Sequence, residues 1–218
     1  VLLSLCGVIF LSGEAIFPAG VLDVKAALRW VKANGANYHL DASRIAAFGG
    51  SAGGYYALML GLSANRPEFN DPDLGNVSYG CDVQVVVEWF GPTDFLKMDQ
   101  QLAESGLEPC DHNDVLSPES RFLGAQITKI PEKVKIASPL TYVHAGIPAL
   151  LVQHGRLDHL VPYQQSLLLV QELEKHGLRD RIEFDILENA DHADPLFETP
   201  ENMQRVFNFM DKHLRIKA

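Results

Sequence analysis

The stretch RIAAFGGSAGGYYALML, residues 44–60, joins two apolar runs through a glycine-rich turn that contains one serine. The first run has the composition of a buried strand, and the second is apolar on every side, as in a buried helix. Gly49, Ser51 and Gly53 fit the pattern Gly-x-Ser-x-Gly. A strand before this pattern and a helix after it are the setting in which such a serine is a nucleophile.

The glycines around this serine have a physical reason. We expect Ser51 to lie in a strained turn, where side chains at positions 49 and 53 would collide with neighbouring backbone. Such a turn projects the hydroxyl from the edge of the sheet. It also directs the backbone N–H of Ala52 toward the negative charge that develops on an attacked carbonyl. Ser51 is therefore the predicted nucleophile and Ala52 the predicted oxyanion-hole donor.

A phosphate-binding loop and a dinucleotide-binding turn are two other glycine-rich structures, and the sequence fits neither. A phosphate-binding loop has the pattern Gly-x-x-x-x-Gly-Lys-Ser/Thr, but no lysine, serine or threonine directly follows Gly53 or Gly54. A dinucleotide-binding fingerprint requires glycine where Ser51 stands. A purely structural glycine turn is the alternative that stays open.

The amino-acid composition favours a single globular domain and disfavours several kinds of partner. A chain of 218 residues, 47% hydrophobic and 21% charged, fits one globular domain spanning residues 1–218. The excess of 28 Asp+Glu over 18 Lys+Arg gives a net charge of −10, which disfavours nucleic acid and anionic membrane surfaces as partners. The cysteines, Cys6, Cys81 and Cys110, lack metal-ligand spacing, and the pairing of the last two stays open. Nothing implies a metal or organic cofactor.

The first stretch, VLLSLCGVIFL at residues 1–11, is apolar but too short to cross a bilayer. It lacks the basic start and the cleavage pattern of a signal peptide. We expect a buried strand there, in a chain that begins partway into its fold. Neither the cellular compartment nor the oligomeric state follows from the sequence.

Strand-like and helix-like runs alternate along the rest of the chain. A helix is predicted over residues 17–35, and the last helix begins with Thr199 as N-cap and Pro200 at its first position. Further strands are predicted at 83–91, 147–155 and 181–187, and a further helix at 163–177. The core-facing residues expected on the first and last helices are Val24, Ala27, Leu28, Val31, Met203, Val206, Phe207 and Met210.

This alternation predicts an α/β fold with a mostly parallel sheet and helices on both faces. Sites in such sheets lie beyond the carboxyl ends of the strands. Residues 97–141 interrupt the alternation. They form either a lid or substrate-binding excursion over that end, or a surface insertion with no role in the chemistry.

A serine nucleophile needs a histidine to take its proton and a carboxylate to orient the histidine. In hydrolases of this type the chain order is serine, acid, histidine, with the last two on loops after later strands. Asp158 and His192 occupy those positions. Among competing residues, His154 and His159 are expected in packing or surface roles, Asp191 and Asp194 in local turn hydrogen bonds, and Asp94 in fixing a loop.

Five stretches carry a resemblance: FPAGVLDVKAALRWVKANGANYHLDASRIAAFGGSAGG, GPTDFLKMD, ASPLTYV, HGRLDHLVPYQQSLLL and ADHADPLF. In this order, from about Ser12 onward, they resemble α/β-hydrolases of the carboxylesterase and lipase group. The most similar are bacterial esterases related to feruloyl esterases and hormone-sensitive-lipase-like enzymes. The resemblance implies Ser51 as nucleophile, Asp158 as orienting carboxylate, and His192 as general base and then acid.

The chain departs from that group in two places. Relatives have a His-Gly-Gly loop upstream whose N–H groups complete the oxyanion hole, and none precedes Ser51 here. Many relatives have Glu or Asp where this chain has Gly50. We therefore expect a chain that lacks the usual N-terminal strands.

The resulting hypothesis is a serine carboxylesterase that acts on a small ester with a short-chain acyl, acetyl or feruloyl group. A prolyl-oligopeptidase-like serine peptidase and a catalytically silent binding protein are the alternatives. The aromatic residues Trp89, Phe90, Phe95 and Phe122 either line an acyl pocket or belong to the core.

Overall fold

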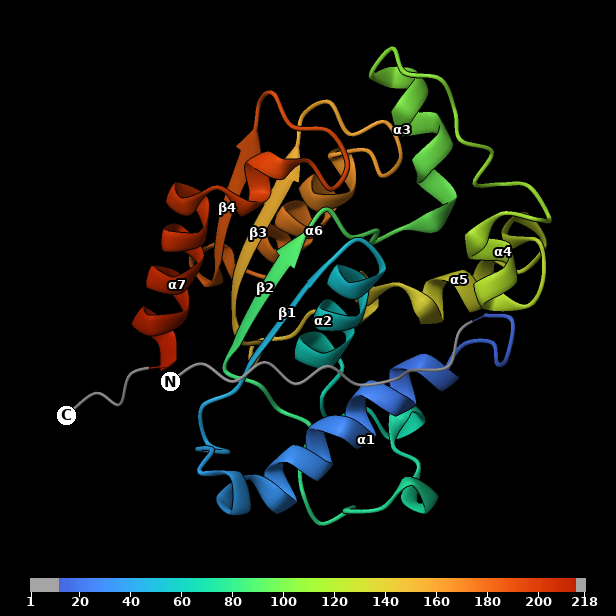
Figure 1. Cartoon of the computed structure of the whole chain (residues 1–218). Helices are drawn as coiled ribbons and strands as arrows, with labels where there is room; N and C mark the ends of the chain where they lie inside the picture. The colour runs from blue at the N-terminus through green and yellow to red at the C-terminus, as the bar shows by residue number, and fades with distance from the viewer. Residues whose placement is uncertain (1–11, 215–218) are drawn as a thin grey trace.

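A parallel sheet forms the centre of the computed structural model, which describes residues 12–214 (Figure 1). Its strands are β1 (Ala46–Gly50), β2 (Val85–Trp89), β3 (Ala149–Gly155) and β4 (Ile182–Leu187). They lie in the order β1-β2-β3-β4, and each neighbouring pair is parallel. The predicted parallel α/β sheet is thus confirmed for the described residues. The strand predicted at residues 1–11 lies outside them.

The register of the strands brings their carboxyl ends to one edge of the sheet. Gly50 of β1 pairs with Trp89 of β2, which pairs in turn with Gln153 of β3. The arrowheads of β2, β3 and β4 in Figure 1 point toward this edge, and β1 runs parallel to β2. The loops that follow the strands are therefore neighbours in space, although they are far apart in sequence.

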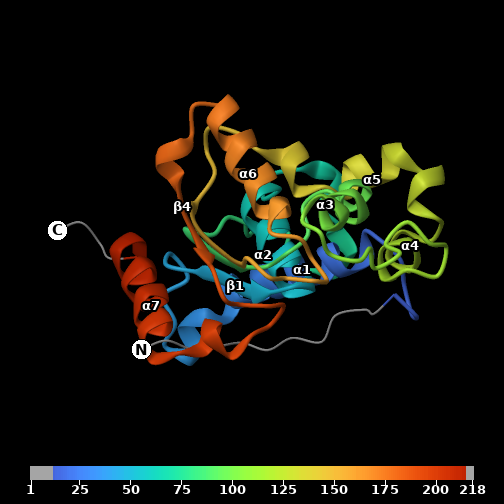
Figure 2. The ribbon, with the colours of Figure 1, turned by 90° about the horizontal axis from the view of Figure 1, so that it is seen from above.

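Helices cover both faces of the sheet, as predicted. They are α1 (Ala19–Asn34), α2 (Ala52–Leu62), α6 (Gln164–Lys175) and α7 (Pro200–Leu214). Successive residues of β2 point to opposite faces, so that Val87 packs in the same apolar cluster as Val206 of α7, while Val86 packs with Leu58 of α2. Figure 2 shows α7 on one side of the sheet and α2 and α6 on the other.

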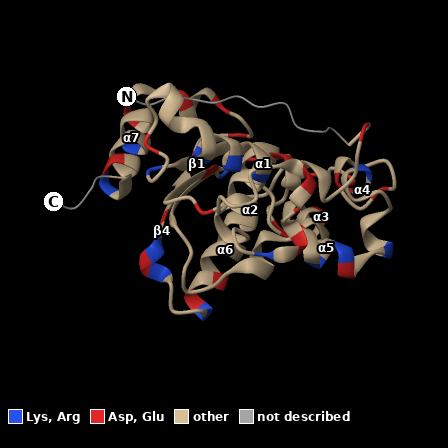
Figure 3. Ribbon diagram, turned by 90° about the horizontal axis from the view of Figure 1, so that it is seen from below, with Lys and Arg blue, Asp and Glu red and all other residues tan. Residues whose placement is uncertain are grey.

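The helix α2 is the most deeply buried helix next to the sheet. It carries no charged residue, and its ribbon is tan throughout in Figure 3. Leu58, Met59 and Leu62 are fully shielded from solvent. A Cβ at Gly61 would lie 2.5 Å from Val86 Cγ2, so that the helix approaches β2 more closely than a side chain there would permit.

The helix α1 buries a different face from the predicted one. Leu28 is buried as expected, but Val24, Ala27 and Val31 are only partly buried. Two cations, Lys25 and Arg29, are buried in their place. Lys25 Nζ donates to the backbone carbonyl of Ser63, and Arg29 Nε donates to the carbonyl of Gly75 at 3.1 Å. The cations are buried because loop carbonyls supply their hydrogen bonds.

The helix α7 begins as predicted and differs on its buried face. Thr199 Oγ1 accepts a hydrogen bond from the Asn202 amide at 3.3 Å, and Pro200 is the first helical residue. The buried stripe is centred on Val206 and includes Phe209 and Met210, with Met203 partly buried. The predicted burial of Phe207 is wrong, because the helical turn carries its side chain away from this stripe, where it is 40% exposed.

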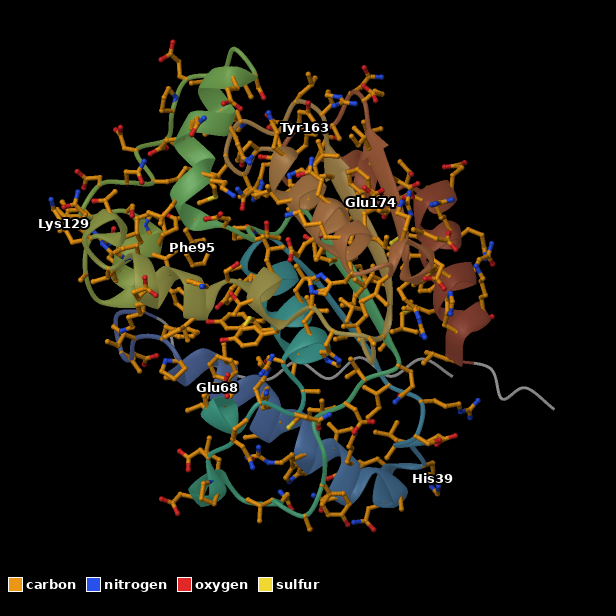
Figure 4. The ribbon with its side chains drawn as sticks, turned by 180° about the vertical axis from the view of Figure 1, so that it is seen from behind. His39, Glu68, Phe95, Lys129, Tyr163 and Glu174 are labelled. Carbon is orange, nitrogen blue, oxygen red and sulfur yellow. The ribbon has the colours of Figure 1, made fainter. Side chains whose placement is uncertain are left out.

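The excursion predicted at residues 97–141 contains three short helices, α3 (Met98–Glu104), α4 (Pro118–Leu123) and α5 (Pro131–Ala137). In Figure 1 it lies beside the sheet, with α3 at the height of the carboxyl ends of the strands. Aromatic side chains join it to α2. The ring centroids of Tyr55 and of Phe122 in α4 are 5.6 Å apart. Phe95, just before the excursion and labelled in Figure 4, has its ring centroid 5.7 Å from that of Tyr55 and 6.2 Å from that of Phe122. Its role as a lid stays a prediction.

Two of the cysteines lie in the described part of the chain, and both are free thiols. Cys81 is buried and Cys110 is exposed, which answers the question of their pairing. Among residues 12–214, no helix combines the length and the apolar character needed to cross a membrane.

Two phenylalanines of α7 provide a matched test of its buried face. Phe209→Ala is expected to lower the free energy of unfolding by about 3–5 kcal/mol, because it empties part of the core. Phe207→Ala removes the same atoms from an exposed position and is expected to change it by no more than about 0.5 kcal/mol. Urea unfolding followed by circular dichroism measures both. Equal losses would contradict the orientation of α7.

Candidate active site

Ser51 occupies a sharp turn between β1 and α2. Its backbone has φ 57° and ψ −123°, in the left-handed half of conformational space that non-glycine residues rarely adopt. Two hydrogen bonds hold the turn: Ser51 N–H donates to Trp89 O at 2.8 Å, and Tyr55 N–H donates to Ser51 O at 3.0 Å. The strained turn predicted at this position is therefore present.

The surroundings of each glycine show which positions near the turn have no room for a side chain. A Cβ at Gly49 would overlap backbone atoms of Gly53, as predicted for this position. A Cβ at Gly53, however, would meet nothing within 4 Å, so the predicted collision there is wrong. The crowded position is Gly54, where a Cβ would lie 2.9 Å from Trp89 O. Gly53 contacts Gly49 through its backbone, so the close packing at this point depends on the missing side chain of Gly49 and not on that of Gly53.

Three side chains from three loops meet at the carboxyl edge of the sheet. His192 Nε2 is 3.0 Å from Ser51 Oγ, and His192 Nδ1 is 2.8 Å from Asp158 Oδ2. A carboxylate can only accept, so Nδ1 carries a proton and Nε2 is left to accept from the serine hydroxyl. The three residues predicted as nucleophile, acid and base thus form one continuous chain of hydrogen bonds.

Asp158 is held as a buried carboxylate. Its Oδ1 accepts from the amides of Leu160 at 3.0 Å and Val161 at 2.7 Å, while Oδ2 faces His192. Burial by itself would raise the pKa of Asp158, but the hydrogen bonds from His154 and His192 outweigh burial and lower it to about 2. The carboxylate is consequently charged at neutral pH and fixed in one orientation.

His154 has a closer relation to the site than its predicted packing role. It is fully buried, and its Nε2 lies 2.7 Å from Val161 O and 3.3 Å from Asp158 Oδ2. Its Nδ1 lies 2.7 Å from Ser166 Oγ in α6. The signal in the sequence was a histidine at a strand end, four residues before the acid. The spacing along the chain does not show which histidine the acid contacts, so the sequence alone does not predict the contact between His154 and Asp158.

Asp194 and Asp94 make local hydrogen bonds, as predicted, whereas Asp191 bonds both its neighbour His192 and the distant His159. Asp194 Oδ1 accepts from Leu196 N at 2.9 Å, and Asp94 Oδ1 accepts from Leu96 N at 3.3 Å. Asp191 Oδ1 accepts from His192 N and from the exposed His159, both at 2.6 Å. Asp191 therefore contacts the backbone of the histidine loop and not the imidazole of His192.

The excursion borders the acid loop. His112 is buried, and its Nε2 lies 2.9 Å from the carbonyl oxygen of Leu160. Leu160 also supplies one of the amides that hold Asp158. Residues within 97–141 therefore contact the loop that positions the acid.

The aromatic residues considered for an acyl pocket belong mainly to the core. Trp89, Phe90 and Phe95 are buried, and Phe122 is partly buried. Phe90 alone of these four has a ring contact with a site residue among those described, with its centroid 4.8 Å from the His192 ring.

A buried acid lies beneath the turn. Glu88 of β2 is fully buried, its Oε1 accepts from the Gly91 amide, and Oε2 has no hydrogen-bond partner among the described residues. Burial raises the pKa of Glu88 to about 8, so the side chain is mainly neutral near pH 7.

Comparison with known proteins gives consistent matches. Residues 10–173 match the family model described as BD-FAE. The chain is 33% identical over 159 residues to the probable carboxylic ester hydrolase LipM of Mycobacterium tuberculosis, covering 73% of this chain and 34% of LipM. It is 31% identical over 190 residues to esterase LipQ of the same organism, covering 86% of this chain and 42% of LipQ. The chain thus spans well under half the length of these curated relatives.

Solved structures show the same fold. A truncated form of a carbohydrate esterase from gut microbiota superposes with a TM-score of 0.80 at 30% identity, covering 93% of this chain and 70% of that one. A thermophilic esterase, Est2, from Thermogutta terrifontis superposes with a TM-score of 0.66 at 22% identity, covering 94% and 68%. The structure is therefore an α/β-hydrolase fold.

The buried acid predicts a pH dependence of stability. The pKa of Glu88 is about 8 in the folded protein against an ordinary value of 4.5, so the unfolded chain loses this proton first as pH rises. Its contribution to stability is complete below pH about 4.5 and is lost as pH rises to about 8. Glu88→Gln should flatten this decline in the thermal midpoint.

The matched control is Glu108→Gln at an exposed position, which is expected to keep the wild-type profile. Parallel profiles for wild type and Glu88→Gln between pH 4.5 and 8 would rule out a neutral Glu88.

Proposed function

Because the chain belongs to the BD-FAE family of α/β-hydrolases, we propose that it is a serine carboxylesterase that works through an acyl-enzyme. The observation that carries this proposal is the hydrogen-bonded chain from Ser51 Oγ through His192 to Asp158, at 3.0 and 2.8 Å. The names of the relatives, carboxylic ester hydrolase and esterase, favour the same reaction.

Acylation follows from this geometry. His192 Nε2 takes the proton of Ser51 Oγ as the oxygen attacks the carbonyl carbon of the ester. The imidazole becomes a cation, which the buried Asp158 carboxylate stabilises. When the tetrahedral intermediate collapses, the ester C–O bond breaks and His192 returns the proton to the leaving alcohol. Ser51 is then bonded to the acyl group.

Deacylation repeats these steps with water. His192 Nε2 takes a proton from a water molecule whose oxygen attacks the acyl carbon. The bond from that carbon to Ser51 Oγ breaks, and His192 returns the proton to Oγ. The acid product leaves and the site is restored.

The backbone N–H of Ala52 supports the negative oxygen in both steps. Ala52 is the first residue of α2, and the N–H groups of a first helical turn have no acceptor within the helix. The positive end of the helix dipole adds to this stabilisation. The strained Ser51 backbone places this N–H next to the nucleophile.

The substrate class is a small-molecule ester with a short-chain acyl, acetyl or feruloyl group. The exposed rim includes the apolar residues Leu157, Leu160 and Leu196, on the loops that carry the acid and the histidine. Apolar side chains there suit an acyl or aryl group. A structural relative at 30% identity is named a carbohydrate esterase, which favours an acylated sugar among the alcohols to be tested.

Ser51→Ala is expected to abolish hydrolysis of p-nitrophenyl acetate, a loss of about 10⁶-fold in kcat, because no other group replaces the nucleophile. The control is Ser78→Ala, at an exposed serine, which should hydrolyse at the wild-type rate. Release of p-nitrophenol and covalent labelling by a fluorophosphonate measure the two variants. Retained turnover in Ser51→Ala would contradict the assignment of Ser51 as nucleophile. Hydrolysis of an amide matched to the ester substrate would identify a peptidase instead of an esterase.

Asp158→Asn is expected to lower kcat by about 10⁴-fold with KM little changed, because an amide favours the wrong tautomer of His192. Asp194→Asn changes the same atoms in a carboxylate whose hydrogen bonds, among residues 12–214, come from the backbone amides of Leu196 and Asp191, and most of the activity should remain. A loss in Asp194→Asn as large as in Asp158→Asn would contradict the assignment of the acid.

A further inference from the structure

Phe90, directly after β2, has an unusual backbone conformation. Its φ is 43°, a left-handed value that costs a bulky residue about 1–3 kcal/mol. Its N–H donates to Gln153 O of β3 at 3.0 Å, and the following amide, Gly91 N, donates to the buried carboxyl of Glu88. These two hydrogen bonds hold the turn after β2 in its strained form.

The strained turn directs the Phe90 ring under the histidine of the site. The ring centroid lies 4.8 Å from that of His192 with an interplanar angle of 63°, and 4.6 Å from that of Phe197 at 72°. Phe197 belongs to the short segment that follows His192 in the chain. The ring therefore packs against both the imidazole and the segment that carries it.

The same ring fills the space next to Gly50. A Cβ at position 50 would lie 2.9 Å from Phe90 Cζ and 3.1 Å from Cε2, so the ring would have to shift to make room for it. The backbone of Gly50 does not have a positive φ, so an alanine there is opposed by the ring and not by its own backbone conformation. Gly50 directly precedes Ser51.

We propose that Phe90 is a positioning residue for the general base His192, and that glycine at position 50 leaves free the space that the Phe90 ring occupies. The inference rests on the proposed function. Trp89 O accepts from Ser51 N at 2.8 Å, and the next residue, Phe90, directly after β2, contacts His192. Two consecutive residues thus align a nucleophile and a base that are 141 positions apart in the chain.

Phe90→Leu tests the contact with the imidazole. Leucine keeps an apolar branched side chain but removes the ring, so we expect kcat to fall about tenfold to a hundredfold with KM little changed. Phe209→Leu is the matched control. It removes the same atoms from the same apolar cluster, where Phe209 packs against His213 instead, and should leave kcat unchanged.

A double-mutant cycle tests the role of Gly50. Gly50→Ala is expected to lower kcat at least tenfold, by displacing the ring. In the double variant Gly50→Ala/Phe90→Leu, the atoms that the new Cβ would meet are gone. Its kcat should therefore be no lower than that of Phe90→Leu alone. If the losses in kcat of the two single variants multiply in the double variant, the inference is overturned. An unchanged kcat in Phe90→Leu overturns it as well.

A readout without turnover separates this inference from the proposed function. The proton of His192 Nδ1–H, hydrogen-bonded to Asp158, gives a low-field NMR signal that should shift or broaden in Phe90→Leu and not in Phe209→Leu. A wild-type chain without Ser51-dependent hydrolysis would count against the proposed function alone. An equal signal in wild type and Phe90→Leu would count against the positioning role alone.

Discussion

The left-handed backbone at Ser51 is the constraint on which the rest of the site depends. A serine with φ 57° persists only where the surrounding structure compensates for its strain. Here the carbonyl of Trp89 accepts its amide hydrogen, and the absence of a side chain at Gly49 lets α2 close onto β1. The register of β2 against β1 consequently fixes where the serine hydroxyl projects. The apolar packing of α2 keeps that register rigid.

A buried charge imposes the second constraint. Moving a carboxylate out of water is costly, and Asp158 is compensated by amides of its own loop, by His192 and by His154. The compensating groups come from β3, from the acid loop and from the histidine loop. Asp158 can therefore stay ionised in its buried position only when these parts are assembled around it. Ionisation of the acid and alignment of the base are therefore outcomes of one packing arrangement.

Hydrophobic patterns in the sequence predicted where strands and helices lie more accurately than they predicted which side of each helix is buried. The run VVVEW at β2 is a strand because β-branched and aromatic residues suit a sheet that is covered on both sides, and every residue of β2 is buried. The faces of α1 and α7 depend on partners that periodicity does not reveal. Lys25 is buried because distant loop carbonyls bond its ammonium group, and Phe207 is exposed because the sheet meets the helix through Val206 and Phe209.

The sequence by itself determined the strand-turn-helix around Ser51, the parallel α/β character of the sheet and the placement of Asp158 and His192 after later strands. These features follow from short-range patterns and from the rule that carboxyl ends of parallel strands meet. Only the tertiary structure decided which acid faces the imidazole, that His154 shares that acid, and that Phe90 lies beneath His192. Those contacts join residues on different strands, and their geometry is set by the register of the sheet and not by spacing along the chain.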